Sequence, residues 1–137
     1  MGFAAQSRPE GVVMVVDDEP LACRIIARVL VDAGFQVVEV HSSIEALRLL
    51  STLEGSVQLV VSDIAMPGLT GVQLAAQIKY RWPAVPVLLL SGYAVPSDYA
   101  GAFVAKPFTW DALLDAVGSL IPLPHRSPPK SQMPLTS

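Results

Sequence analysis

The chain is poor in cysteine and in charge, and both shortages exclude classes of protein. Cys23 is the only cysteine among 137 residues, which excludes an internal disulfide. It lies in a predicted helix among apolar neighbours, and we interpret it as a small core residue because a free cysteine packs as a small hydrophobe. Charged residues make up 15% of the sequence and the formal net charge is -3. No basic stripe is present, so nucleic-acid binding has no compositional support.

Long apolar runs are also missing. The longest, such as Val12–Val16 and Val87–Leu90, have the length of strands and are too short to span a bilayer. Residues 1–10 lack the continuous apolar stretch of a secretory signal. Gln6 stands where an N-myristoylation signal needs Ser or Thr. We therefore expect a cytoplasmic protein with no membrane partner.

Apolar material itself is abundant. Hydrophobic residues make up 52% of the sequence, which is enough for one well-filled core in a chain of this length. We predict a single domain over residues 11–121, a flexible N-terminus over 1–10 and a Pro-rich disordered tail over 122–137. The tail leaves no room for a DNA-binding output domain. The initial Met1 favours a free-standing protein, and a fragment of a hybrid kinase stays an alternative.

Short β-rich runs alternate with helical patterns along the chain. Most of the runs are almost entirely apolar, which is typical of strands that helices cover on both faces. Strands that alternate with helices predict a parallel sheet with right-handed crossovers. The predicted strands are Val12–Val16, Gln36–Val40, Leu59–Ser62, Val85–Leu90 and Ala102–Ala105.

Four helices are predicted between and after these strands from apolar positions at helical spacing. Ser42–Glu45 predicts a capping box that opens the second helix, and Thr109 is expected to cap the last. The second helix should place Ile44, Leu47 and Leu50 on its inner face. The positions that mark the other three are Leu21, Ile25 and Val29, then Val72, Ala75 and Ile78, and finally Leu113, Val117 and Leu120.

Polar residues follow four of the five predicted strands at the point where each strand ends. In an open parallel α/β sheet, ligands bind beyond the carboxyl ends of the strands, near the place where the strand order reverses. Residues far apart in the sequence are therefore expected to converge on one site. They are Asp17 and Asp18 after the first strand, Asp63 after the third, Ser91 after the fourth and Lys106 after the fifth.

These side chains suit one kind of chemistry. Three carboxylates close together repel one another and need a cation, and oxygen ligands favour a hard ion such as Mg²⁺. A carboxylate can accept a phosphoryl group, and phosphoryl transfer depends on positioning and on neutralising the equatorial oxygens. Mg²⁺ and the ammonium group of Lys106 would do this from two sides, and Ser91 could donate a hydrogen bond to a phosphoryl oxygen. A cis peptide between Lys106 and Pro107, which an X–Pro bond tolerates, would fix the loop that aims the lysine.

Four segments resemble the motifs of response-regulator receiver domains. Val13–Pro20 resembles the first-strand motif and Val60–Gly71 resembles the phosphoacceptor segment. Leu90–Tyr93 resembles the segment that bears the hydroxyl, and Lys106–Phe108 resembles the lysine segment. Each motif alone is weak, but four in order at strand ends form a strong joint signal. The resemblance covers roughly residues 12–120.

The resemblance implies a fold and a metal site. The fold is a single-domain, flavodoxin-like (βα)5 doubly wound parallel sheet with strand order 2-1-3-4-5. The implied ligands of Mg²⁺ are Asp18, Asp63 and the backbone carbonyl of Ala65, with Asp17 acting through water.

The resemblance also implies a function in a two-component phosphorelay. A histidine kinase or histidine phosphotransfer protein would phosphorylate Asp63, and the chain would signal by binding an unknown downstream protein. Ser91 and Phe103 would form the switch pair. We expect no enzymatic activity beyond self-catalysed phosphorylation and dephosphorylation of Asp63, and a monomer or weak dimer.

The sequence departs from the family pattern at two places. Thr70 stands where the family usually has Asp, and we interpret it as a local cap. Ser91 and Lys106 are 15 residues apart (106 − 91), which is shorter than usual by about two helical turns. Pro96 and Gly101 interrupt this link, and only Ser97–Ala100 could form a helical turn. We predict that most of the family's fourth helix is replaced by a loop or a single turn.

This shortening leads to three expectations. Phe103 should be more exposed than usual, because the helix that would cover it is missing. The usual family dimer through that face should not form in its ordinary geometry. The site should be more open on that side, with Tyr93 or Tyr99 folding over it as partial cover.

The sequence also bears on two other functions. A phosphatase of the haloacid-dehalogenase type needs a second Asp two residues after its nucleophile, but Ala65 follows Asp63 at that spacing and Glu19 follows Asp17. A receiver-like interaction module that never takes phosphate is the other alternative, which the shortened link keeps open. His41 follows the second strand, and we interpret it as a surface-loop residue with no metal or catalytic role.

Overall fold

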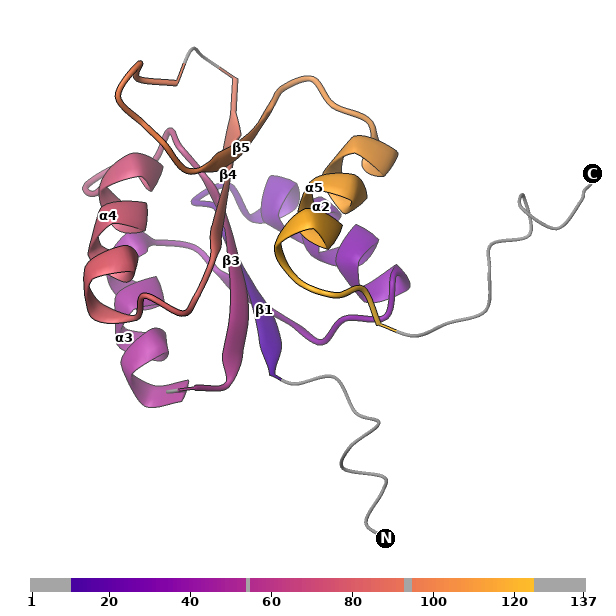
Figure 1. Cartoon of the computed structure of the whole chain (residues 1–137), viewed down its shortest axis with the longest axis horizontal. Helices are drawn as coiled ribbons and strands as arrows, with labels where there is room; N and C mark the ends of the chain where they lie inside the picture. Colours follow the sequence, from indigo (N-terminus) through magenta and orange to yellow (C-terminus); the bar gives the residue numbers. More distant parts are fainter. Residues whose placement is uncertain (1–10, 54, 93–94, 125–137) are drawn as a thin grey trace, which may run out of the picture.

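Five parallel strands form one sheet in the order β2-β1-β3-β4-β5 (Figure 1), the order that the family resemblance implies. The computed structural model describes residues 11–53, 55–92 and 95–124. The strands are β1 Val12–Val16, β2 Val37–Val40, β3 Val57–Asp63, β4 Val87–Ser91 and β5 Ala102–Ala105. The helices are α2 Pro20–Asp32, α3 Ser43–Leu53, α4 Gly71–Arg81 and α5 Trp110–Leu120. Of the segments predicted to be loose, 1–10 and 125–137 lie outside the described residues.

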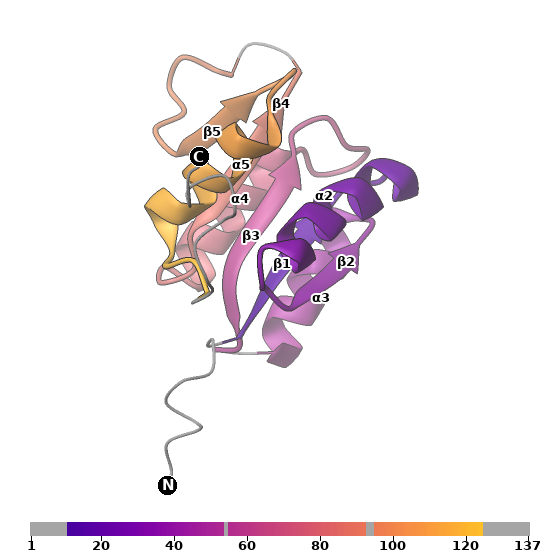
Figure 2. The same ribbon diagram turned by 90° about the vertical axis from the view of Figure 1, so that its right-hand side faces the viewer.

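Two helical layers enclose the sheet. Helices α2 and α5 cover one face, and α3 and α4 cover the other (Figures 1 and 2). Successive residues of β1 alternate between the two cores: Val13 and Val15 face α2 and α5, whereas Met14 and Val16 face α3 and α4. Burial on both faces explains why the central strands are continuous apolar runs, since each fully buried side chain of this kind contributes about 1.5–3 kcal/mol. None of the described helices is long and apolar enough to cross a membrane.

The inner faces of two helices differ from what periodicity alone suggests. In α2 the buried side chains are Cys23, Ile26, Ala27 and Leu30. Leu21 and Ile25, which mark this helix in the sequence, therefore lie on its outside, and Leu21 is 74% exposed. The interpretation of Cys23 as a core residue is confirmed.

Helix α3 is rotated relative to the prediction. Ile44 is 63% exposed, so its assignment to the inner face is wrong, whereas Leu50 is buried as predicted. The buried positions are Ser43, Ala46 and Leu50, which repeat at helical spacing. The Ser43 hydroxyl donates a 2.8 Å hydrogen bond to the carbonyl of Leu69, and this bond turns the polar start of the helix inward.

Side chains that were predicted to cap helices are found at the helix ends. The Ser42 hydroxyl accepts a hydrogen bond from the Glu45 N–H at 3.1 Å. The Glu45 carboxylate accepts one from the N–H of His41 at 3.5 Å, one residue before the cap, so the box is shifted from its usual form. The Thr109 hydroxyl caps α5 by accepting a bond from Ala112 N–H at 3.0 Å.

The link between β4 and β5 holds no helix in its described part, residues 95–101, as predicted. It makes a turn in which the N–H of Tyr99 donates to the carbonyl of Pro96 at 2.9 Å. The helix labelled α4 lies between β3 and β4, so the helix that the family places between β4 and β5 has no counterpart in the described link. Phe103 on the edge strand β5 is consequently 48% exposed.

The described part of the link between β4 and β5 lies along α4. Together with Val72, Ala75 and Lys79 of that helix it lines a cavity of about 450 Å³. Tyr99 belongs to this lining, and its hydroxyl donates to the carbonyl of Ala102 at the start of β5. The expectation that Tyr99 covers the site at the far end of β5 is therefore wrong, and Tyr93 lies outside the described residues.

Candidate functional site

The polar residues picked out from the sequence lie at one edge of the sheet. Asp17 follows β1, Asp63 ends β3, Ser91 ends β4 and Lys106 follows β5. Parallel pairing aligns these ends: Val16 pairs with Ser62, Asp63 with Leu90, and Ser91 with Ala105. Because β3 lies between β1 and β4, Asp63 stands at the centre of the group.

Three carboxylates form the acidic part of the site. Oxygen atoms of Asp17, Asp18 and Asp63 lie within 4.8 Å of one another. Asp17 is buried, Asp63 is half-buried and Asp18 is exposed. The Asp17 Oδ1 accepts a 2.9 Å hydrogen bond from the N–H of Glu19, which fixes this side chain toward the group.

The three carboxylates repel one another, so a cation would stabilise them. Burial raises the pKa of Asp17 above its ordinary value, and the charges of Asp63 and Asp18 raise it further. The Glu19 N–H and the charge of Lys106 act in the opposite direction without cancelling the rise. Three carboxylates, one of which is buried where its charged form is disfavoured, offer only oxygen ligands. Such a set fits a hard divalent ion such as Mg²⁺.

Lys106 approaches from the other side. Its Nζ lies 3.3 Å from Oδ1 of Asp63, and 38% of its side chain is exposed. Its backbone N–H donates to the carbonyl of Ser91 at 2.6 Å, which ties the lysine segment to the end of β4. The Lys106–Pro107 peptide is cis, as predicted. The backbone of Lys106 is thus fixed while its ammonium group is partly exposed to solvent, so this group can move to stay close to negative charge at Asp63.

Ser91 and Phe103 are placed by the sheet on one face. Ser91 is buried and Leu89, two residues before it, pairs with Phe103. Since Leu90 points into the core beneath α2 and α5, Leu89 and Ser91 point to the opposite face, and so does Phe103. The two residues of the predicted switch pair therefore share the face on which the described part of the link between β4 and β5 holds no helix.

The loop after β3 is anchored at both ends. The N–H of Ile64 donates to the carbonyl of Leu90, and the N–H of Gly71 donates back to the carbonyl of Ile64. A Cβ on Gly71 would overlap the carbonyl oxygen of Asp63, so only glycine lets α4 begin this close to the acceptor. Ala65, whose carbonyl was assigned to the metal, lies exposed in this loop two residues beyond Asp63.

Thr70 acts as the local cap that was predicted. Its hydroxyl accepts from the N–H of Gln73 at 3.2 Å, and the Gln73 side chain accepts from the N–H of Thr70 at 2.9 Å. This capping box satisfies two N–H groups at the start of α4. The threonine thus replaces the family's usual Asp without loss of the helix start.

The comparisons with known proteins agree with this geometry. The family model described as "Response regulator receiver domain" matches residues 13–118. The chain belongs to this family. Phosphorylation and Mg²⁺ binding are general to receiver domains, which interact with histidine kinases or phosphotransfer proteins in two-component systems.

Relatives of this receiver domain include much longer proteins. The hydrogenase transcriptional regulatory protein HoxA of Cupriavidus necator is 36% identical over 119 residues, which are 81% of this chain and 24% of that protein. The sensor kinase CckA of Brucella abortus is 32% identical over 116 residues, 80% of this chain and 12% of that protein. The chain therefore spans about a quarter or less of the length of these relatives.

Solved structures of other receivers share its fold. The response regulator TrrA of Thermotoga maritima, in complex with Mg²⁺–BeF, is 30% identical with a TM-score of 0.74. The matched region covers 81% of this chain and 99% of the TrrA chain. A receiver domain protein of Clostridium thermocellum is 29% identical with the same TM-score. The matched region covers 80% of this chain and 93% of the other chain.

Proposed function

We propose that Asp63 of this receiver domain accepts a phosphoryl group from a histidine kinase or histidine phosphotransfer protein. The observation that carries the proposal is the convergence of Asp63 with a lysine 3.3 Å away and two further carboxylates within 4.8 Å, all at the carboxyl edge of the sheet. The family match supports it, because phosphorylation is general to receivers.

The transfer would be a nucleophilic displacement at phosphorus. An oxygen of the Asp63 carboxylate forms a bond to phosphorus while the phosphorus–nitrogen bond of a phosphohistidine breaks. The electron pair of that bond stays on the imidazole nitrogen, which takes a proton. The acyl phosphate that forms remains on Asp63 until water removes it, so we propose no turnover of a separate substrate.

Each neighbouring residue has a part in this step. The ammonium group of Lys106 neutralises charge on the phosphoryl oxygens from one side. Asp17, Asp18, Asp63 and the carbonyl of Ala65 would hold Mg²⁺, which when bound offsets the charge on the other side. Asp17 would act through water, because it is buried and already bonded to a backbone N–H.

Signalling would follow through a change of surface. Ser91 would donate its hydroxyl proton in a hydrogen bond to a phosphoryl oxygen, and Phe103 would rearrange on the same face of the sheet. A downstream protein that binds this face would read the change. The exposed position of Phe103 supports this role, because its ring can rotate without displacing a covering helix.

Intact mass measurement tests the proposal. Purified protein treated with acetyl phosphate and Mg²⁺ should gain one phosphoryl group, and Asp63→Ala should abolish the gain. EDTA should prevent it as well. Unchanged mass together with no binding of beryllofluoride would favour the alternative function, an interaction module that takes no phosphate. The lack of a helix over residues 95–101 of the link between β4 and β5 also supports this alternative.

A further inference from the structure

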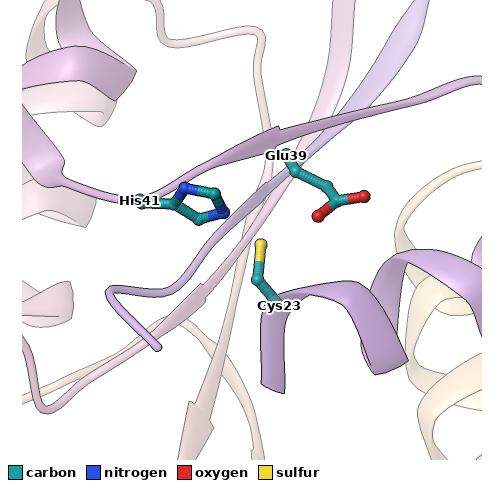
Figure 3. A group of neighbouring side chains, drawn as sticks. All are labelled: Cys23, Glu39 and His41. Carbon is teal, nitrogen blue, oxygen red and sulfur yellow. The ribbon is translucent and has the colours of Figure 1, made fainter. Parts of the chain in front are cut away.

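A second group of metal-binding side chains lies beneath α2, away from the carboxylates of the phosphoacceptor site. It consists of Cys23 on α2, Glu39 on β2 and His41, which follows β2. The sulfur, one carboxylate oxygen and one imidazole nitrogen lie within 4.8 Å of one another. Figure 3 shows the three side chains pointing toward a common space. His41 is exposed after β2, as the surface-loop interpretation predicts, but it also lies beside Cys23 and Glu39.

The sheet register brings these residues together. Glu39 pairs with Val15 of β1, which faces the core beneath α2, so the Glu39 side chain points to the same face. His41 follows two residues later, just beyond the end of that strand, and is exposed. Cys23 is fully buried on the helix above. A fixed thiol therefore faces two ligands that have room to move.

The donor set differs in kind from the acidic site. Sulfur, imidazole nitrogen and carboxylate oxygen together suit Zn²⁺ and similar ions, whereas Mg²⁺ takes oxygen ligands. Three protein ligands and one position open to water is a common arrangement for such an ion. Ligand atoms around tetrahedral zinc lie roughly 3.3–3.8 Å apart. Since the three ligand atoms lie within 4.8 Å of one another, the group contracts by at most about 1.5 Å to close on an ion. The partly exposed Glu39 and exposed His41 can supply that movement.

The contacts that hold the ligands are weak enough to yield. The Cys23 Sγ lies 3.5 Å from the carbonyl oxygen of Val15 and 3.9 Å from that of Val40, and its single proton donates to only one of them at a time. The Arg24 Nε donates to Oε2 of Glu39 at 2.8 Å, but 70% of the Arg24 side chain is exposed. An ion pair this exposed contributes about 0–1 kcal/mol, so it presents a small barrier to metal binding.

The thiol sets a condition on the ion. Burial raises the pKa of Cys23 to about 11, so the thiol carries its proton near neutral pH. A metal that binds must displace this proton: the S–H bond breaks, a sulfur–metal bond forms, and the proton goes to solvent. Ions with high affinity for thiolate can do this, and Mg²⁺ cannot.

We propose that Cys23, Glu39 and His41 form a binding site for a divalent transition metal of the zinc type, with no ligand in common with the phosphoacceptor site. The proposal does not depend on phosphorylation of Asp63. Its ligands come from two neighbouring elements, α2 and the end of β2, so a bound ion would tie this helix to the edge strand of the sheet.

Cobalt is the probe, because a thiolate bound to Co²⁺ gives a charge-transfer absorption in the near ultraviolet. Cys23 is the only cysteine of the chain, so any such band reports this residue. The reduced full chain, with Mg²⁺ in excess to occupy the acidic site, should develop the band with one equivalent of Co²⁺. Addition of Zn²⁺ should bleach it.

Variants distinguish a three-ligand site from a cysteine acting alone. Cys23→Ser should abolish the band, and Glu39→Gln and His41→Ala should each weaken Co²⁺ binding at least about tenfold, since even loss of a supporting partner costs 10–100-fold. Asp18→Ala and His125→Ala, which alter the acidic site and the chain's other histidine, should leave the affinity unchanged. Circular dichroism checks that each variant folds.

Three results would overturn the proposal. One is absence of the band at excess Co²⁺. Another is a band whose Co²⁺ affinity is unchanged in both Glu39→Gln and His41→Ala, which would mean that Cys23 binds alone. The third is saturation of the band at half an equivalent of Co²⁺, which would mean that two chains share the ion. Because His41 is exposed, His41→Ala keeps the test decisive even if Cys23→Ser fails to fold.

Discussion

Gly71, the first residue of α4, offers a direct test of how closely this helix is fitted to the acceptor segment. The residue is buried, and its φ does not lie in the left-handed region, so backbone conformation alone does not require glycine there. The requirement comes from space. A Cβ would overlap the carbonyl oxygen of Asp63 and come within 2.7 Å of Cα of Ile64. Both neighbours are backbone atoms that cannot rotate away.

The expected cost of Gly71→Ala follows from these contacts. Forcing extra atoms into a filled space costs about 1–3 kcal/mol, and this more than offsets the gain of up to about 1 kcal/mol that alanine brings to a helix. The helix start must move, and it is bonded to Ile64 beside Asp63. A displacement of 1 Å at a reacting group can slow a reaction by about 100-fold. The variant should lose stability and phosphorylation rate together.

Urea denaturation and phosphorylation by acetyl phosphate measure both effects, and Gly118→Ala is the matched control. Gly118 also lies within a helix, but a Cβ there meets only the Leu123 side chain at 3.4 Å or more, an ordinary contact. Gly118→Ala should therefore gain up to about 1 kcal/mol with an unchanged rate. A Gly71→Ala protein as stable and as quickly phosphorylated as the parent chain would refute the packing argument.

Four further changes have defined outcomes. Asp18→Ala should weaken Mg²⁺ binding more than Asp17→Ala in calorimetric titration, because Asp18 is assigned as a direct ligand; the reverse order would overturn that assignment. Because the pKa of Asp17 is raised in the folded state, folding favours the protonated carboxyl group, and the free energy of unfolding falls as pH rises from 3.8 through the folded pKa. Asp17→Asn should therefore resist urea better than the parent chain at pH 7 with EDTA. Mg²⁺ should reduce this difference, because it stabilises the ionised carboxylate. Lys106→Ala should slow phosphorylation by about 100-fold while changing the free energy of unfolding by no more than about 1 kcal/mol; a large loss of stability would contradict this. Phosphorylated protein should not dimerise through β5 in ordinary family geometry, and a concentration-dependent dimer in sedimentation that Phe103→Ala abolishes would count against it.

The parts of this fold that follow from local chemistry could be predicted from the sequence. The continuous apolar runs mark strands that are buried on both faces, and the polar residues that end them fall at one edge because all strands are parallel. Thr70 and Thr109 could be identified as caps because a hydroxyl before an apolar period has one common use. Pro96 and Gly101 already excluded a regular helix between the last two strands.

Other features depend on contacts that periodicity does not report. Ile44 was placed inward, whereas the bond from Ser43 to the Leu69 carbonyl rotates α3 the other way. Tyr99 was expected near the acceptor, but a loop direction has no sequence period, and the residue lies against α4 instead. The nearness of His41 to Cys23 requires the pairing register of β1 with β2, which no single segment encodes.

The edge of the sheet at β5 bears on the behaviour of many copies of this chain together. An edge strand offers unpaired backbone groups to which another chain can add a strand, and an apolar edge without a covering helix is exposed to this hazard. Here the edge is only four residues long, Ala102–Ala105. Lys106 ends it with a charge and Pro107 with a residue that has no N–H to offer. The segment that brings the lysine to Asp63 thereby also limits strand addition at the β5 edge, so the site and the protection of this edge depend on the same short stretch of chain.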